Sequence, residues 1–180
     1  MPFHEVNGLK YYSFASFDEY GVTNAIFTRR GGVSPKPWKS LNIGGTVGDQ
    51  DEAVRTNLCR MFDAANRKFS SRYDSWQVHG DILLQIKTPR PEKEPHVKAD
   101  GLITDQPEVT LLMRFADCVP ILLYDPTRNV GGIVHAGWKG TVLQIAKKAV
   151  AFLQEQFGCT PSALIAGIGP SIGPDDYEVG

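Results

Sequence analysis

The sequence predicts a layered α/β domain built on a mixed sheet, and two features lead to that prediction. Two segments show the apolar spacing of amphipathic helices, and several short apolar runs between turn residues are typical of strands. Two of those runs flank a short polar loop, which predicts a hairpin. Hairpins mixed with helices favour a mixed sheet over a doubly wound parallel one. The length of 180 residues predicts a single domain over residues 1–180.

Two helices are predicted from apolar periodicity. The first begins at Asp49, which forms a D-x-x-E start signal with Glu52, and ends at about Asn66. The second begins near Gly140 and ends at Gly158, a residue type that commonly terminates helices. The apolar residues at helical spacing are Val54, Leu58, Met61, Phe62 and Ala65 in the first, and Val142, Ile145, Ala146, Ala149, Val150, Leu153 and Phe157 in the second.

Strands are predicted for the short apolar runs. These runs are Thr23–Thr28, Trp76–Val78, Ile82–Lys87, Thr110–Ala116, Ile121–Tyr124, Val130–His135 and Ala163–Gly167. The segment Asp125–Asn129 is rich in turn residues and predicts the hairpin between the fifth and sixth runs. The polar, proline-rich segment Lys87–Ala99 is interpreted as an exposed loop.

Composition excludes several classes of protein. The chain has 19 basic and 20 acidic side chains and a net charge of −1, so no electrostatic footprint for nucleic acid or an anionic membrane is present. The first residues do not resemble a signal peptide, and no stretch approaches the ~20 apolar residues of a membrane helix. Three cysteines at wide spacing favour reduced thiols, and we therefore expect a cytoplasmic protein.

Three side chains at predicted strand ends could share a metal ion. His79 follows an apolar run, Cys118 lies where another run breaks, and His135 ends a third. They are 39 and 17 residues apart, which is too far for a local zinc knuckle, so only the fold could bring them together. Two imidazoles and a thiolate would form a zinc site with an open fourth position, which is typical of catalysis.

Simpler interpretations of the same residues stay open at this point. A single histidine at a strand end is more often a hydrogen-bonded structural residue, and Cys118 in an apolar run is by itself most often a small buried hydrophobe. The segment Arg29-Arg30-Gly31-Gly32 is either an anion-binding nest with a guanidinium clamp or an exposed turn with solvated charges.

Several motifs, in order along the chain, resemble one family. They are FTRRGGVS, SLNIGG followed by VGD, QVHG, ADGLIT, ADCVPILLYDP, GGIVHAGWKGT and GIGPSIGPDDYEVG. Together they are similar to the YfiH-like family, also called the laccase-domain or multicopper polyphenol oxidase family. The resemblance extends from about Asn24 to the last residue. Members of this family continue beyond the YEVG motif, so the chain resembles a C-terminally shortened member.

The resemblance implies a layered α/β/α fold with a single zinc site, whose ligands correspond to His79, Cys118 and His135. It implies phosphorolysis of adenosine, inosine, guanosine and methylthioadenosine, and deamination of adenosine. A related role proposed for bacterial members is the editing of peptidoglycan precursors. The expected partners are a purine nucleoside and phosphate. The residues that correspond to the family's anion and substrate pocket are Arg30, Ser34, Ser40 and Asn42.

A working mechanism follows from these assignments. Asp117 or Asp100 would orient a ligand or a polar substrate group. Phosphate held by Arg30 would attack the anomeric carbon of the ribose and release the purine base, and in deamination activated water would attack C6 of the purine and release ammonia. The chain lacks the H-x-E and P-C-x-x-C motifs of zinc nucleobase deaminases. Deamination would therefore use a different set of residues.

Three alternatives were compared with this hypothesis. Two histidines and one cysteine can also hold a single blue copper, so copper stays possible. A multicopper laccase needs many more imidazoles than the two that remain, His4 and His96, so laccase chemistry is rejected and copper is judged non-native. A metal-free hydrolase or deamidase would use Cys118 as nucleophile and His135 or His79 as base. An inactive, shortened binding remnant would bind neither zinc nor nucleoside.

Overall fold

The computed structural model describes residues 3–178 and divides into two compact units, Met1–Phe69 and Ser70–Gly180. Each unit contains a sheet, and the larger sheet has both parallel and antiparallel neighbours. The prediction of a mixed α/β fold with a mixed sheet is therefore confirmed. The expectation of a single domain over the whole chain stays a prediction.

The first unit contains a small antiparallel sheet in the order β1-β2-β3. Its strands are β1 (Phe3–Val6), β2 (Leu9–Tyr12) and β3 (Ile26–Phe27), and the short helix α1 (Ala15–Asp18) follows β2. Strands β1 and β2 were not predicted. The Asn-Gly pair at positions 7 and 8, with φ of 52° and 78°, is a characteristic hairpin turn and was the available signal.

Helix α2 (Asp51–Ala64) confirms the first predicted helix and buries its apolar side. Its start signal was misinterpreted, because the helix is capped at Gln50 without a side-chain hydrogen bond. The Asp49 carboxylate instead accepts a hydrogen bond from Asn42 at 2.9 Å. Asn57, fully buried on α2, donates to Ser34 Oγ at 2.9 Å and accepts from the Val33 backbone at 2.8 Å. This asparagine fixes the loop before α2.

The second unit is built on a five-stranded sheet in the order β10-β8-β9-β6-β5. The strands are β5 (Leu83–Gln85), β6 (Gly101–Thr104), β8 (Val119–Asp125), β9 (Val130–Ala136) and β10 (Ile165–Ile168). Strands β5 and β6 are parallel, and the other pairs are antiparallel. The predicted hairpin is confirmed as β8 and β9, which pair along their whole length.

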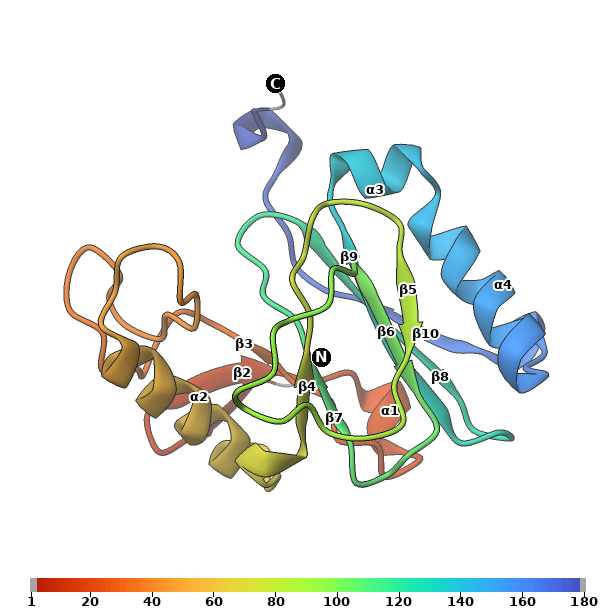
Figure 1. Cartoon of the computed structure of the whole chain (residues 1–180), viewed down its shortest axis with the longest axis horizontal. Coiled ribbons are helices and arrows are strands. Elements are labelled where there is room, and N and C mark those ends of the chain that lie inside the picture. Colours follow the sequence, from red (N-terminus) through yellow and green to blue (C-terminus); the bar gives the residue numbers. More distant parts are fainter. Residues whose placement is uncertain (1–2, 179–180) are drawn as a thin grey trace. The chain divides into compact units, whose positions relative to one another are not determined.

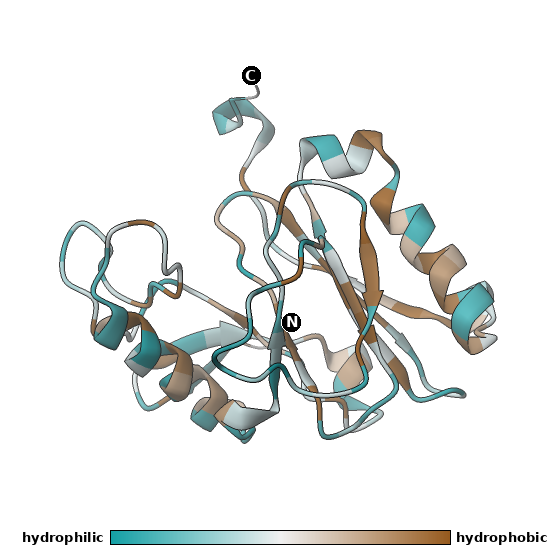
Figure 2. Cartoon of the chain, viewed as in Figure 1, coloured by the Kyte–Doolittle hydropathy of each residue, from teal (hydrophilic) through white to brown (hydrophobic). Residues whose placement is uncertain are grey.

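Helices α3 (Trp138–Val142) and α4 (Ile145–Phe157) lie along one face of this sheet (Figure 1). The strands are mostly hydrophobic, whereas α4 carries both hydrophobic and hydrophilic residues (Figure 2).

The second predicted helix is divided into α3 and α4, because Gln144 adopts a left-handed φ of 59° between them. Gly158 ends α4 with a φ of 65°, as predicted. The core between α4 and the sheet contains Ile103, Leu123, Val130, Val134, Ala136, Ile145, Ala149, Leu153 and Cys159.

A second apolar cluster in this unit contains Ile86, Ala99, Leu102, Val109 and Met113. Nearby, β4 (Arg72–Asp74) and β7 (Thr110–Leu112) form a parallel pair. The prediction of a strand at Trp76–Val78 was wrong, since only Trp76 forms an isolated bridge, with Lys98. The exposed loop at Lys87–Ala99 is largely confirmed, although Arg90 and Ala99 within it are buried.

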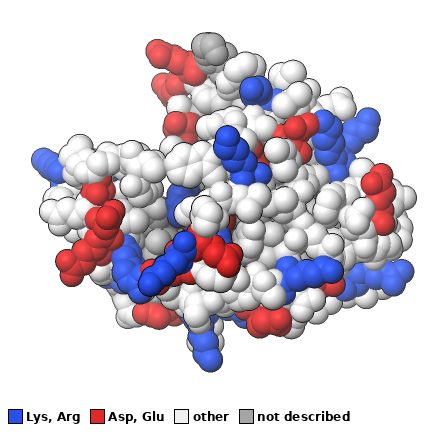
Figure 3. Space-filling view, in the orientation of Figure 1, with Lys and Arg blue, Asp and Glu red and all other residues white. Residues whose placement is uncertain are grey.

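The elements are completed by three short 3-10 turns, η1 (Phe69–Ser71), η2 (Pro161–Ala163) and η3 (Pro174–Asp176). Basic and acidic side chains are interspersed on the face of the molecule seen in Figure 3. Among residues 3–178, none of the helices has the length and hydrophobicity needed to span a bilayer.

Candidate metal centre

The three predicted ligands come together in the second unit. The nitrogen and sulfur atoms that His79, Cys118 and His135 can offer all lie within 4.8 Å of one another. Cys118 directly precedes β8, and His135 lies near the end of β9, where it pairs with Pro120. Because β8 and β9 are antiparallel, the start of one strand lies beside the end of the other. The hairpin therefore brings together two ligands that are 17 residues apart.

A buried carboxylate, Asp100, connects the third ligand to this pair. Its side chain is fully buried and accepts a hydrogen bond from His135 Nδ1 at 2.8 Å. It also accepts hydrogen bonds from the backbone N–H groups of Val78, His79 and Gly80 at 3.2, 2.9 and 2.8 Å. One carboxylate thus holds both the ring of His135 and the loop that carries His79.

These hydrogen bonds also favour the ionised form of Asp100. Burial alone would raise the pKa of Asp100, but the hydrogen bonds from His135, Gly80 and Val78 outweigh it and lower the pKa below its ordinary value. An ionised Asp100 accepts a proton-bearing Nδ1, and the Nε2 lone pair of His135 is then free to bind an ion.

Two glycines allow the close packing around the ligands. A Cβ atom at Gly137 would lie 3.0 Å from Cys118 Sγ and 3.1 Å from His79 Cδ2. A Cβ atom at Gly140 would lie 3.0 Å from the carbonyl oxygen of Gly80. His79 itself has a φ of 58°, in the left-handed region that residues other than glycine rarely adopt. Unusual backbone geometry of this kind is often found at functional sites.

The three side chains fit a metal ion such as zinc. Two imidazole nitrogens and one thiolate are donors that zinc binds, and a catalytic zinc keeps three protein ligands and one open position. The hydrogen bond from His135 to Asp100 is the kind of outer contact that orients zinc-bound histidines.

The environment of Cys118 does not by itself activate the thiol. Burial raises its pKa, and the negative charges of Asp117 and Asp100 add to that effect, while a hydrogen bond with Tyr177 opposes it. A cysteine that acts as a nucleophile without a metal usually has a lowered pKa. Two aspartates were proposed to orient a ligand. Asp100 is hydrogen-bonded to His135, whereas Asp117 is exposed.

The predicted phosphate and substrate residues lie in the first unit. Arg30 is exposed, whereas Ser34 is buried against Asn57. Ser40 Oγ donates to the Arg29 carbonyl at 3.2 Å, and Asn42 donates to Asp49. The side chains of Ser34, Ser40 and Asn42 thus have partners within their own unit.

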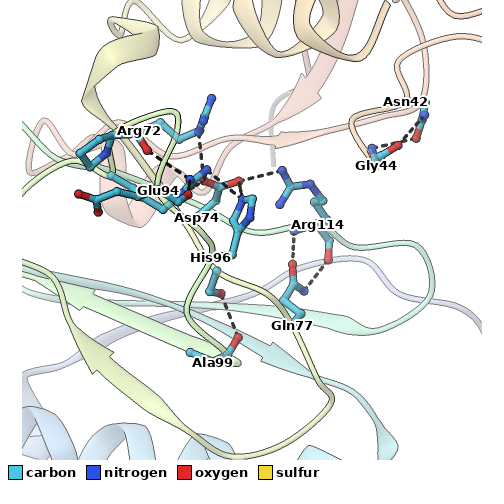
Figure 4. A network of polar contacts seen from close by, with 12 residues as sticks. Asn42, Gly44, Arg72, Asp74, Gln77, Glu94, His96, Ala99 and Arg114 are labelled. Carbon is cyan, nitrogen blue, oxygen red and sulfur yellow. Dashed lines mark hydrogen bonds and ion pairs between the residues drawn. The ribbon is translucent and has the colours of Figure 1, made fainter. Parts of the chain in front are cut away.

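A polar network around Asp74 was not predicted (Figure 4). The Asp74 side chain is 1% exposed. Its carboxylate is hydrogen-bonded to Arg72, Arg90, Arg114 and His96. The residues are 2, 16, 40 and 22 positions away in the sequence. Gln77 of the QVHG motif, to which the sequence assigned no role, forms two hydrogen bonds with the backbone of Arg114.

The fold and the site define a mixed α/β protein with a candidate His-Cys-His metal centre. Residues 23–180 match the family described as multi-copper polyphenol oxidoreductase laccase. The chain belongs to this family, and the resemblance inferred from its motifs is confirmed.

Relatives support the same conclusion. A Bacillus subtilis protein named purine nucleoside phosphorylase YlmD is 42% identical over 165 residues, which cover 88% of this chain and 59% of that protein. The crystal structure of YlmD from Geobacillus stearothermophilus has a TM-score of 0.89 and 33% identity, covering 97% of this chain and 66% of the other. The crystal structure of Bacillus licheniformis hypothetical protein YfiH has a TM-score of 0.87 and 33% identity, covering 98% and 67%. The chain thus spans about three fifths of the length of the B. subtilis relative.

Proposed function

We propose that this chain carries the zinc centre of a purine nucleoside enzyme that performs phosphorolysis of adenosine, inosine, guanosine and methylthioadenosine, and deamination of adenosine. The observation that carries the proposal is the convergence of His79, Cys118 and His135, with Asp100 behind them. The name of the B. subtilis relative, a purine nucleoside phosphorylase, supports the phosphorolytic reaction.

Each residue of the centre has a distinct proposed role. His79, Cys118 and His135 would hold zinc, which supplies a Lewis acid that polarises a bound reactant. Asp100 keeps a proton on Nδ1 of His135 and holds the His79 loop through backbone N–H groups. The exposed Asp117, next to Cys118 in the sequence, is proposed to contact a polar group of the substrate.

Arg30, Ser34, Ser40 and Asn42 are proposed as the residues for phosphate and substrate. The exposed guanidinium of Arg30 is suited to a phosphate oxygen. The internal hydrogen bonds of Ser34, Ser40 and Asn42 favour a role in shaping the loop that presents Arg30. Such a clamp would orient phosphate for attack on the anomeric carbon of the ribose.

The remaining histidines favour one metal ion over a multicopper cluster. The chain has four histidines, and the two outside the centre have other partners. His4 Nε2 bonds Ser13 Oγ at 2.8 Å, and His96 Nε2 bonds Asp74 at 3.0 Å. A multicopper oxidase needs several further imidazoles around its copper ions, and these two are engaged elsewhere. This supports a single metal ion over a multicopper cluster.

The test is incubation of the chain with adenosine, with and without phosphate, followed by chromatography of adenine, inosine and hypoxanthine. We expect phosphate-dependent adenine and phosphate-independent inosine. Cys118→Ala should abolish both products and remove tightly held zinc. Cys59→Ala, which changes another half-buried thiol, should retain them.

The rival functions predict other results. A metal-free cysteine hydrolase would keep its activity after chelation and lose it after thiol alkylation. A binding remnant would form no product and hold no zinc. Product formation that Cys118→Ala leaves unchanged would refute the proposed centre.

A further inference from the structure

Three segments carry the metal ligands, and each must be held at a fixed distance from the other two. The segments that carry Cys118 and His135 are fixed by the pairing of β8 with β9, in which Val119 lies opposite Ala136. The segments that carry His79 and His135 are fixed by Asp100. These contacts fix two of the three separations between ligand-bearing segments.

Gln77 fixes the third separation, between the segments that carry His79 and Cys118. Its Nε2 donates to the carbonyl oxygen of Arg114 at 2.8 Å, and its Oε1 accepts from the N–H of Arg114, also at 2.8 Å. Figure 4 shows the two bonds closing a ring between the side-chain amide and the backbone. Gln77 lies two residues before His79, and Arg114 lies four residues before Cys118. The amide therefore bonds one ligand-bearing segment directly to the other.

Both ends of this contact are themselves anchored. Trp76, the neighbour of Gln77, donates to the carbonyl of Val97 at 2.9 Å and accepts from Ala99 at 3.1 Å. The guanidinium of Arg114 donates to the buried Asp74 at 2.8 Å. The Gln77 side chain thus connects two segments whose own positions are restrained, and it transmits that restraint to the ligands.

We propose that Gln77 is a positioning residue of the metal centre, which keeps the Cys118 sulfur at bonding distance from an ion held by the two histidines. This inference rests on the proposed metal site. Loss of outer contacts of metal ligands typically lowers metal affinity about 10–100-fold. Because Gln77 acts on the cysteine segment, its loss should affect the bond to sulfur more than the bonds to nitrogen.

The experiment uses Co²⁺ as a spectroscopic substitute for zinc. Thiolate-to-cobalt charge transfer in the near ultraviolet reports the bond to Cys118, and competition with a chelator gives the affinity. Gln77→Leu removes both hydrogen bonds, whereas Gln77→Glu keeps the acceptor for the Arg114 N–H and loses the donor. Gln106→Leu is the matched control, since Gln106 is a half-buried glutamine of the same unit whose side chain donates to the adjacent Asp105 at 2.7 Å.

We expect wild type and Gln106→Leu to bind Co²⁺ with the full charge-transfer band. Gln77→Leu should bind at least about tenfold more weakly, with a weaker band per bound ion, and Gln77→Glu should be intermediate. Thermal unfolding of the metal-free proteins shows whether each variant folds; if Gln77→Leu does not, Gln77→Glu decides.

Two negative results are distinguishable. Wild-type affinity and a full band in the decisive Gln77 variant would overturn the role of Gln77 and leave the metal site intact. Absence of a thiolate band in the wild type would overturn the proposed metal site, and the inference with it.

Discussion

Two buried aspartates of the second unit differ in what surrounds them. Asp74 is 1% exposed, and its partners are charged or titratable side chains. Asp100 is fully buried, and its partners are three backbone N–H groups and one imidazole. Both carboxyls have a pKa below the ordinary value, although burial alone would raise it. The same protonation state is thus reached in two ways.

The difference indicates two roles. At Asp74, hydrogen bonds and charges from Arg114 and Arg90 compensate the carboxylate, so this residue is an electrostatic anchor for distant segments. At Asp100, neutral dipoles solvate the carboxylate without cancelling its charge. That charge remains directed at His135, and such outer contacts orient metal-binding histidines. The first arrangement favours stability, and the second favours a preorganised site.

The largest expected effect is on stability at the Asp74 cluster. Asp74→Asn leaves the buried guanidiniums of Arg72 and Arg90 without their counter-charge. Breaking a buried ion pair by removing one partner costs about 3–5 kcal/mol, so the free energy of unfolding in urea should fall by that amount. Asp63→Asn, an exposed change, should stay within about 0.5 kcal/mol. Equal losses in both variants would contradict the role of Asp74 as an anchor.

The next effect concerns metal affinity at Asp100. Asp100→Asn preserves the shape of the side chain but removes the charge behind His135 and places an NH₂ group among backbone donors. We expect folded Asp100→Asn to bind zinc about 10–100-fold more weakly in chelator competition. Asp105→Asn, a half-buried control in the same unit, should bind like the wild type. An unchanged affinity in Asp100→Asn would remove the distinction between the two aspartates.

A smaller effect is expected from acid. Because the pKa of Asp74 is lowered in the folded chain, its contribution to stability is complete above the unfolded value of about 3.9 and is lost as the pH falls through the folded value. The difference in stability between wild type and Asp74→Asn should therefore be constant near pH 6 and shrink below about pH 4. Urea unfolding across this range measures it. A constant difference down to low pH would show that the charge of Asp74 is not its source.

The sequence predicted those parts of the fold that depend on local periodicity. Helix α2 and the β8–β9 hairpin were predicted because apolar spacing and turn residues lie within one segment. Strand β4 was missed because Arg72-Tyr73-Asp74 is polar, and its burial depends on partners distant in the sequence. The break at Gln144 was missed because a left-handed residue between two apolar periodicities leaves no compositional signal.

The candidate site was predicted only in part, because its residue types are visible in the sequence whereas its long-range contacts are not. Residue type and position at strand ends identified His79, Cys118 and His135, but their spacing could not show that they meet; the motifs of the family implied it. Asp100 and Asp117 were equivalent in the sequence, and only the hydrogen bond to His135 separates them. Gln77 acts through the backbone of a residue 37 positions away, and such a contact is visible only in the folded chain.

The smallest effect is expected from the histidine partner of Asp74, and it sharpens the comparison. His96 is 32% exposed in its side chain and bonds both Asp74 and Arg90, yet the carboxylate keeps its arginines when the imidazole is removed. Partly exposed ionic contacts contribute little, so His96→Ala should lower the free energy of unfolding by less than about 1 kcal/mol and leave zinc affinity unchanged. His135→Ala removes the corresponding partner of Asp100 and should abolish tight zinc binding. An equal loss of stability in His96→Ala and Asp74→Asn would contradict this expectation. It would show that Asp74 needs His96 as much as Asp100 needs His135.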